Sequence, residues 1–473
     1  MTEQTSRPHY ERYHIETDKA PDIVRWPNRF NVKVGKVGLA THLVKEVIHQ
    51  KGDLELILAR PCIYGVFSRP VGGFAPDQKK CVGCLRCMNE YPEFVEVSRN
   101  PARERLGDSY FVSTYVDAVA YEAESGRVPV KGAGYRGKFG GADWDGIWTD
   151  MSEIVRPTRD GIHGREFIST VVDIGTKPGF LSFDGEGRPV GPLPNTFTIP
   201  LPMIFDAPAE QVATDTLYRT LARAAGAIES LAILPLGVIL RLGLSGEHLA
   251  PLVGPGEVDR LDALGFAPRL VEVDGWDAEL FDVVRARFPQ AQVALRLPFG
   301  GEAELLQCAD CGVSVFHLTA DYHGRGAGGA FIFDLIRDAH TAFVEAGRRD
   351  EVTLLGSGGV IAAEHVPKAI AAGLDAVALD TPLLVALQAR FSGDFTSRHT
   401  NGVSLPNRLT AEWGAARLSN LMAAWRDQLL EVLGAMGLRE VRRLRGEMGR
   451  VLLQKDLEYE AFAEIEGYLS EGV

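Results

Sequence analysis

Four of the six cysteines lie close together near the start of the chain. Cys81, Cys84 and Cys87 are each separated by two residues, and Cys62 precedes them. Thiolates at successive two-residue spacings wrap around one face of an iron–sulfur cluster, and cysteine pairs with this spacing also bind zinc. The pattern is more typical of an iron–sulfur cluster, with zinc or no metal as the alternatives.

The fourth ligand expected for such a run is missing. An iron–sulfur run commonly continues with three residues, a fourth cysteine and a proline, but this chain has Tyr91 followed by Pro92. Cys62 is the nearest cysteine outside the run, and we therefore predict it as the fourth ligand. Clustered cysteines in a protein without a signal peptide indicate metal or redox chemistry rather than disulfides.

Two turns in the second half of the chain could bind an anion. Gly358 and Gly359 follow Ser357 at the end of an apolar run, and glycines let backbone N–H groups approach a phosphate. Thr381 follows Asp380 after the next apolar run and offers a hydroxyl and an N–H group. The carboxylate of Asp380 is expected to point away from a phosphate bound there.

A further polar segment could supply an acid and a base. Asp321 and His323 follow the apolar run at 313–318, and Asp and His side chains commonly transfer protons in enzymes. A solvated loop is the alternative interpretation.

Eight short apolar runs must position these residues. Segments with helical spacing lie between most of them, and this alternation predicts a (β/α)8 barrel, with a doubly wound open sheet as the alternative. In such a barrel the candidate residues lie at the carboxyl ends of the strands, where active sites are found. The predicted strands are 198–205, 229–236, 248–253, 269–274, 292–297, 313–318, 352–356 and 375–380.

The 473 residues suggest more than one domain. We predict a cysteine-bearing module at 1–108, an extended arm at 109–195, the barrel at 196–392 and a helical extension at 393–473. The formal net charge of −13 argues against nonspecific nucleic-acid binding and against an anionic membrane surface. No apolar stretch approaches the length of a membrane span, so a cytoplasmic protein is expected.

The second half of the chain resembles the FMN-binding synthase domain of glutamate synthases. The resemblance lies in the order and spacing of 317–331, 339–359, 371–387 and 416–437. The cysteine segment resembles the ferredoxin-like stretch that precedes this domain in archaeal-type members. In all, the resemblance covers roughly residues 60 to 460.

This resemblance implies a (β/α)8 barrel of the FMN-binding type and a 4Fe–4S cluster on the four cysteines. The FMN phosphate would lie on the turn of Ser357, Gly358 and Gly359 and on the backbone around Asp380 and Thr381. Arg296 stands where the family has a strand lysine near the flavin, and a cation there would stabilise the anionic reduced ring. A structural salt bridge at the strand end is the alternative for Arg296.

Three departures from the family pattern stand beside the resemblance. The first-strand motif of the family is replaced by Ile204–Phe205–Asp206–Ala207–Pro208–Ala209, and "PLGVIL" stands where a glycine-rich loop follows the second strand. The cysteines that hold a 3Fe–4S cluster in the family are absent from 395–409. The chain therefore resembles a divergent member of the glutamate synthase family.

The predicted function is that of an oxidoreductase that passes electrons between a 4Fe–4S cluster and FMN. The predicted substrate is a small amino or keto acid, or an imine, with Arg296, Asp321 and His323 as catalytic residues. An electron-donor or amidotransferase-type subunit is the expected partner. The alternative is a non-catalytic iron–sulfur relay or scaffold subunit with a degenerate barrel.

Overall fold

The computed structural model describes residues 13–52, 62–67, 74–128, 140–151, 168–177, 181–191 and 193–465. The described chain forms two compact units. Residues 24–116 make the smaller unit, and the other described residues make the larger one. Within these described ranges, no helix has the length and apolar character needed to cross a membrane.

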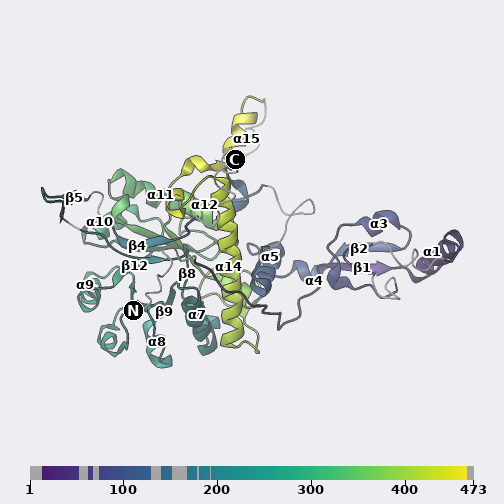
Figure 1. The fold of residues 1–473 in the computed structure, drawn as a ribbon, viewed down its shortest axis with the longest axis horizontal. Helices are drawn as coiled ribbons and strands as arrows, with labels where there is room; N and C mark the ends of the chain where they lie inside the picture. Colours follow the sequence, from purple (N-terminus) through teal and green to yellow (C-terminus); the bar gives the residue numbers. More distant parts are fainter. Residues whose placement is uncertain are drawn as a thin grey trace, which may run out of the picture. The chain divides into compact units, whose positions relative to one another are not determined.

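The larger unit is built around a closed barrel of eight parallel strands (Figure 1). Neighbouring strands pair in parallel all the way round, which confirms the predicted (β/α)8 barrel and excludes the open sheet. Most strand residues are buried, as expected for parallel strands covered by helices. The strands are β8 (Met203–Phe205), β9 (Ala232–Pro235), β10 (Leu249–Val253), β11 (Leu270–Asp274), β12 (Gln292–Pro298), β13 (Val315–Thr319), β14 (Thr353–Ser357) and β15 (Ala376–Leu379).

Helices follow the strands and cover the barrel from outside. The first begins where the side chain of Thr214 accepts a hydrogen bond from the Leu217 backbone N–H, a standard helix start. A 3-10 helix, η6 (Val258–Ala263), takes the place of an α-helix between β10 and β11. The α-helices are α7 (Asp215–Ala227), α8 (Leu236–Leu242), α9 (Ala278–Arg287), α10 (Glu302–Asp310), α11 (Ile332–Glu345), α12 (His365–Ala372) and α13 (Thr381–Ala386).

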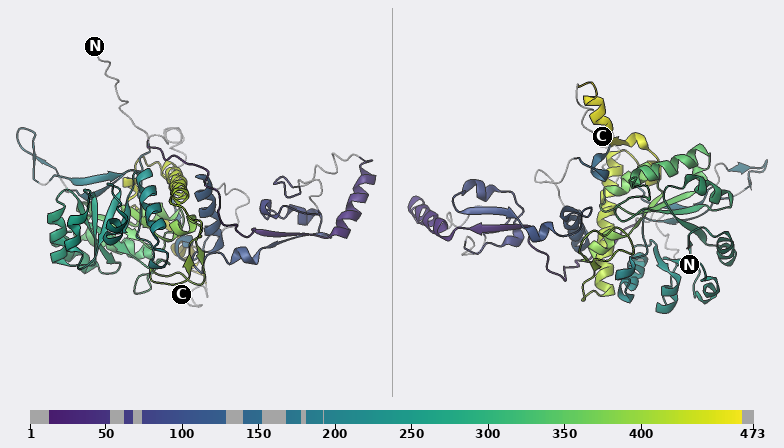
Figure 2. Two further views of the ribbon diagram at one scale, coloured as in Figure 1. Left: turned by 90° about the horizontal axis from the view of Figure 1, so that it is seen from below. Right: turned by 180° about the vertical axis from the view of Figure 1, so that it is seen from behind.

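A hairpin covers the amino-terminal end of the barrel. Its strands, β4 (Val172–Thr176) and β7 (Asn195–Ile199), are antiparallel. The Thr353 hydroxyl, at the start of β14, contacts both the N–H and the C=O of Gly175. Between these strands, the short hairpin of β5 (Ser182–Phe183) and β6 (Pro189–Val190) extends away from the barrel (Figures 1 and 2).

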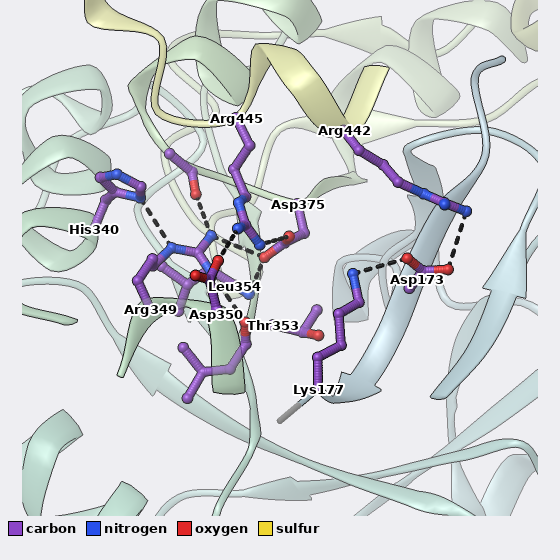
Figure 3. Close-up of polar contacts among 12 residues, drawn as sticks. Asp173, Lys177, His340, Arg349, Asp350, Thr353, Leu354, Asp375, Arg442 and Arg445 are labelled. Atoms are coloured by element: carbon purple, nitrogen blue, oxygen red, sulfur yellow. Dashed lines mark hydrogen bonds and ion pairs between the residues drawn. The ribbon is translucent and has the colours of Figure 1, made fainter. Parts of the chain in front are cut away.

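A buried charge cluster ties the same end of the barrel together (Figure 3). Asp375, just before β15, accepts hydrogen bonds from Arg349 at 2.9 Å and from Arg445 at 3.1 Å. Arg349 also contacts Nδ1 of His340, and burial together with Arg349 and Arg445 lowers the pKa of His340 to about 4. Because residues at this end of a barrel contribute mainly to stability, we interpret the cluster as structural.

The C-terminal helix α14 (Ala411–Ala435) packs beside α7 (Figure 1). Its buried Arg417 donates hydrogen bonds to the backbone of Ala386 and Ala20 and to the carboxylate of Asp22. Residues 13–23 are thereby held against the rest of the larger unit. Beyond α14, β18 (Val451–Leu453) pairs with β3 (Ile147–Thr149), and α15 (Gln454–Phe462) follows.

The smaller unit is a two-stranded sheet with short helices. Strands β1 (Phe30–Val34) and β2 (Val95–Arg99) are antiparallel, with Val32 opposite Val97. The buried core residues Val32, Val66, Val95 and Val97 contact the half-buried Cys62, Cys81 and Cys87. The helical elements are α1 (Lys36–His49), η1 (Gln78–Lys80), α3 (Arg86–Glu90) and α4 (Pro101–Glu104), and α5 (Ser113–Ser125) then leads into the larger unit.

Candidate functional site

A buried ion network lies at the carboxyl end of the barrel. Arg296 in β12 donates hydrogen bonds to Asp206, directly after β8, and to Glu272 in β11. Nδ1 of His317, in β13, lies 3.0 Å from Oε2 of Glu272 and 3.4 Å from Arg296. Since an ionised carboxylate only accepts, Nδ1 of His317 carries a proton in this contact. The network therefore joins three neighbouring strands, β11, β12 and β13, to the end of β8, which is not adjacent to them in the barrel.

The charges of the network support one another. Burial opposes ionisation of Glu272, but His317 and Arg296 lower its pKa to about 2. Burial also opposes the charge of Arg296, and the carboxylates of Asp206 and Glu272 reverse this and raise its pKa. Arg296 therefore stays cationic between two anionic carboxylates. In this structure Arg296 forms salt bridges with Asp206 and Glu272, which is the alternative considered for it from the sequence.

Asp380 carries a carboxyl group in an unusual state beside this network. Its Oδ1 accepts a hydrogen bond from the Thr381 N–H at the start of α13, whereas Oδ2 is buried without a hydrogen-bond partner among the described residues. Burial, with the nearby charge of Asp206, raises the pKa of Asp380 to about 7. Asp380 is thus partly protonated at neutral pH. The hydroxyl of Thr381 and Nε2 of His317 are also buried without a partner in the described chain.

Asp206, Asp380 and Tyr322 line one small cavity, together with side chains of α7 and α13. Its volume is about 10 Å³, which is room for about one water molecule. A flavin ring does not enter this space unless the surrounding side chains move. Burial and the charges of Asp380 and Asp206 raise the pKa of the Tyr322 phenol, so it remains a neutral hydrogen-bonding group.

The glycine turn after β14 is tightly packed. Gly358 and Gly359 have φ values of +99° and +68°, a region that favours glycine. A Cβ on Gly358 would lie 2.5 Å from the carbonyl oxygen of Asp321, so this glycine is also required by packing. The Gly359 carbonyl accepts a hydrogen bond from the indole of Trp144, which is stacked on His365.

The predicted acid and base lie in the loop after β13, with different surroundings. Oδ1 of Asp321 accepts hydrogen bonds from the N–H groups of His323 and Arg325, at 2.9 and 2.7 Å. The Asp321 carboxylate therefore holds the loop in its turn. Arg325 forms an ion pair with Asp143, from the segment before β3.

The four cysteines of the smaller unit line one cavity. Cys62, Cys81, Cys84 and Cys87 surround it with Val32, Val66, Phe67 and Val97 among its apolar walls, and its volume is about 20 Å³. All four are free thiols. Burial raises the pKa of Cys81 and of Cys87, and neighbouring thiols add to both shifts. The structure therefore brings Cys62 to the run at Cys81–Cys87.

The backbone of the cysteine loop is shaped for this convergence. Gly83 and Leu85 have φ values of +70° and +61°, and a Cβ on Gly83 would lie 2.2 Å from the ring of Phe30. Backbone N–H groups of Gly83 and Met88 contact the sulfurs of Cys81 and Cys87 and favour their thiolate forms. Hydrogen bonds to thiolate sulfur are a regular feature of iron–sulfur sites.

The cysteine cavity offers thiol donors that both zinc ions and iron–sulfur clusters use. Across the described ranges, no group of three or more His, Cys, Asp or Glu side chains is close enough to hold a single metal ion. An iron–sulfur cluster separates its thiolates by several metal and sulfide ions, so its ligands lie farther apart than those of one zinc ion. Four thiols around an apolar-walled cavity have the donor chemistry of an iron–sulfur cluster, and thiolates also bind zinc.

The sequence analysis did not identify Glu272 in the barrel network or Tyr322 in the neighbouring cavity. Asp206 appeared only in a departure from a family motif. A signal was available, because Glu272, Arg296 and His317 are each a titratable residue inside an apolar strand run. In a barrel, such residues point either to the interior or to the surrounding helices.

Several known proteins with sequences similar to this chain are glutamate synthases. Residues 323–439 match the family model described as the conserved region in glutamate synthase. An archaeal-type glutamate synthase (NADPH) of Dehalococcoides mccartyi is 24% identical over 434 residues, which cover 78% of this chain and 86% of that protein. The archaeal glutamate synthase (NADPH) of Archaeoglobus fulgidus is 25% identical over 492 residues, covering 86% and 94%. That of Methanocaldococcus jannaschii is 39% identical over 124 residues, covering 24% of each chain.

The closed parallel barrel, with its charged residues at the carboxyl ends of the strands, defines a (β/α)8 protein of the enzyme type. Over most of its length the chain is similar to archaeal-type glutamate synthases at 24–25% identity, and residues 323–439 match the conserved region of glutamate synthase.

Proposed function

We propose that this protein is an FMN-dependent oxidoreductase related to glutamate synthase, with a 4Fe–4S cluster held by Cys62, Cys81, Cys84 and Cys87. The observation that carries the proposal is the convergence of Cys62 with the other three cysteines on one cavity. A redox centre in a chain similar to glutamate synthases supports electron transfer as part of the function. Electrons would pass between the cluster and FMN.

The barrel offers groups for FMN at its carboxyl end. The turn of Gly358 and Gly359 and the unpartnered Thr381 hydroxyl would hold the phosphate, and Arg296 would lie near the ring. When bound, FMN supplies hydride and single-electron transfer. The chain's own contribution is electrostatic, because Arg296 is held cationic by Asp206 and Glu272.

A small amino or keto acid, or an imine formed from one, is the proposed substrate. Support comes from the matched proteins, whose names describe glutamate synthases that use NADPH. Asp380 is the proposed proton-carrying group, since its carboxyl is neutral or charged depending on pH near 7. A separate electron-donor or amidotransferase-type subunit would supply the remaining reactants.

A non-catalytic iron–sulfur relay is the second candidate function. The observation that favours it is the filled barrel mouth, where Arg296 is paired with two carboxylates and the neighbouring cavity has about 10 Å³. In that case the barrel would serve as a scaffold and the cysteines as the redox part.

Anaerobic purification of the full chain, followed by flavin, iron and zinc analysis, separates the two candidates. Flavin together with iron supports the oxidoreductase, and iron without flavin supports the relay. Protein with neither flavin nor iron would contradict both. Addition of FMN to the purified protein, followed by fluorescence quenching, checks whether the barrel binds the cofactor after loss during purification.

A further inference from the structure

The cysteine cavity reaches the protein surface at one cysteine. Cys62, Cys81 and Cys87 are half-buried, whereas Cys84 is exposed. A cluster on these ligands would have one edge beside Cys84 at the surface. Electron transfer becomes slow with distance, so an exposed edge is the place where an external electron carrier can approach closely.

Apolar side chains surround this exposed edge. Val82 and Tyr64 line the cavity and are nevertheless 42% and 45% exposed. Ile63, between Cys62 and Tyr64 in the chain, is 83% exposed. Single exposed apolar residues are ordinary, but a group of them around a proposed redox site indicates an interaction surface.

Positive charge lies beside the apolar group. Lys79 and Lys80 form most of η1, directly before Cys81, and both are exposed. An apolar centre with a charged rim is the usual composition of a protein–protein interface. We name Ile63, Tyr64, Lys79, Lys80, Val82 and Cys84 the cysteine face.

We propose that the cysteine face docks a small acidic electron-carrier protein, with its negative surface against Lys79 and Lys80. This inference rests on the proposed function of the cysteines. One electron leaves the reduced carrier and one enters the cluster, so no bond or proton changes at the interface. The lysines would steer the approach of the acidic carrier, and the apolar residues would be buried at the interface once it has docked.

The inference is tested by titrating the anaerobically purified full chain with an acidic plant-type ferredoxin in a calorimeter at low salt. Lys79→Glu/Lys80→Glu is compared with Lys36→Glu/Lys45→Glu, a matched pair of charge reversals on α1. The first variant is expected to bind about tenfold more weakly, and the second within about twofold of wild type. Added salt should weaken wild-type binding. Basic cytochrome c, the charge control, should not bind.

Several results would overturn the docking surface. These are no binding of ferredoxin to the wild type, equal losses in the two variants, or equally tight binding of cytochrome c. Self-association of the chain that only Lys79→Glu/Lys80→Glu abolishes would also overturn it, because the face would then belong to a second copy. Iron and flavin are measured on the same samples, so an absent cluster would contradict the proposed function separately from the binding result.

Discussion

Arg296 shows how a single residue can have its charge fixed by the fold. Its guanidinium lies between Asp206 and Glu272, and His317 contacts the same glutamate. A buried ion group of this kind contributes little net stability when complete, but loss of one partner leaves the others uncompensated. The arrangement keeps a permanent cation at the barrel mouth, whatever binds there.

Substitution of this cation should be costly. Arg296→Met leaves two carboxylates buried without their cation, and the free energy of unfolding should fall by about 3 to 5 kcal/mol. Arg287→Met, whose exposed guanidinium pairs with Asp262, should change it by less than about 1 kcal/mol. Urea unfolding monitored by circular dichroism measures both. Equal effects of the two variants would show that the network is not buried as described.

Asp380 should give the protein a characteristic pH dependence. Its carboxyl has a pKa of about 7 in the folded protein against an ordinary value of 3.8. Between these values the folded state binds more protons at this group than the unfolded state does, so its contribution to stability falls as pH rises. Asp380→Asn removes this pH-dependent contribution to stability. Relative to wild type, the variant should therefore be more stable at pH 8 than at pH 5 in urea unfolding, and parallel pH profiles would contradict the assignment.

At this scale the sequence predicts single residues better than it predicts contacts. The four cysteines could be identified from residue type and spacing, whereas Arg296 was identified from the resemblance to glutamate synthases. The partners of Arg296 could not be identified, because Asp206, Glu272 and His317 come from three different strands. These side chains meet only because each of them points into the barrel. A single apolar run does not specify which of its residues point inward.

Among the elements, the barrel strands were the most predictable feature. All eight predicted runs overlap an observed barrel strand, because buried parallel strands give continuous apolar runs. The expected extended arm at 109–195 contains the helix α5 (Ser113–Ser125). The β4–β7 hairpin was not predicted, because β4 lay in the expected arm and most of β7 in the expected barrel, and local sequence does not connect the two segments.

The charge cluster under β14 and β15 should fix these two strands in place. Asp375→Asn leaves Arg349 and Arg445 without their shared carboxylate (Figure 3), and loss of one buried ionic partner costs about 3 to 5 kcal/mol. Asp350→Asn removes only the exposed partner of Arg445 and should cost less than about 1 kcal/mol. Thermal unfolding of both variants measures the difference. A small effect of Asp375→Asn would mean that packing alone holds the strands.

The whole molecule combines a barrel with a separate cysteine-bearing unit. The larger unit contains the ion network, and the smaller unit contains the four cysteines. The sequence indicated both parts, because the cysteine spacing and the alternation of strands and helices are local patterns. The grouping of residues 13–23 with the barrel unit was not foreseen, since it depends on contacts such as that of Asp22 with Arg417.

We propose that the smaller unit holds one 4Fe–4S cluster on four cysteines, Cys62 included. Tyr91, which stands where a fourth cysteine would be expected, packs against His42 and Phe94 instead. Tyr91→Phe and Cys308→Ser, a change in the barrel unit, are therefore controls that should leave the cluster intact. Cys62→Ser should lose or convert it, as Cys84→Ser should.

The most direct measurement is the iron and acid-labile sulfide content of the anaerobically purified chain and of Cys62→Ser. We expect about four iron and four sulfide ions per wild-type chain, and a marked loss in Cys62→Ser. Zinc in place of iron, no metal, or an unchanged cluster in Cys62→Ser would contradict the proposal.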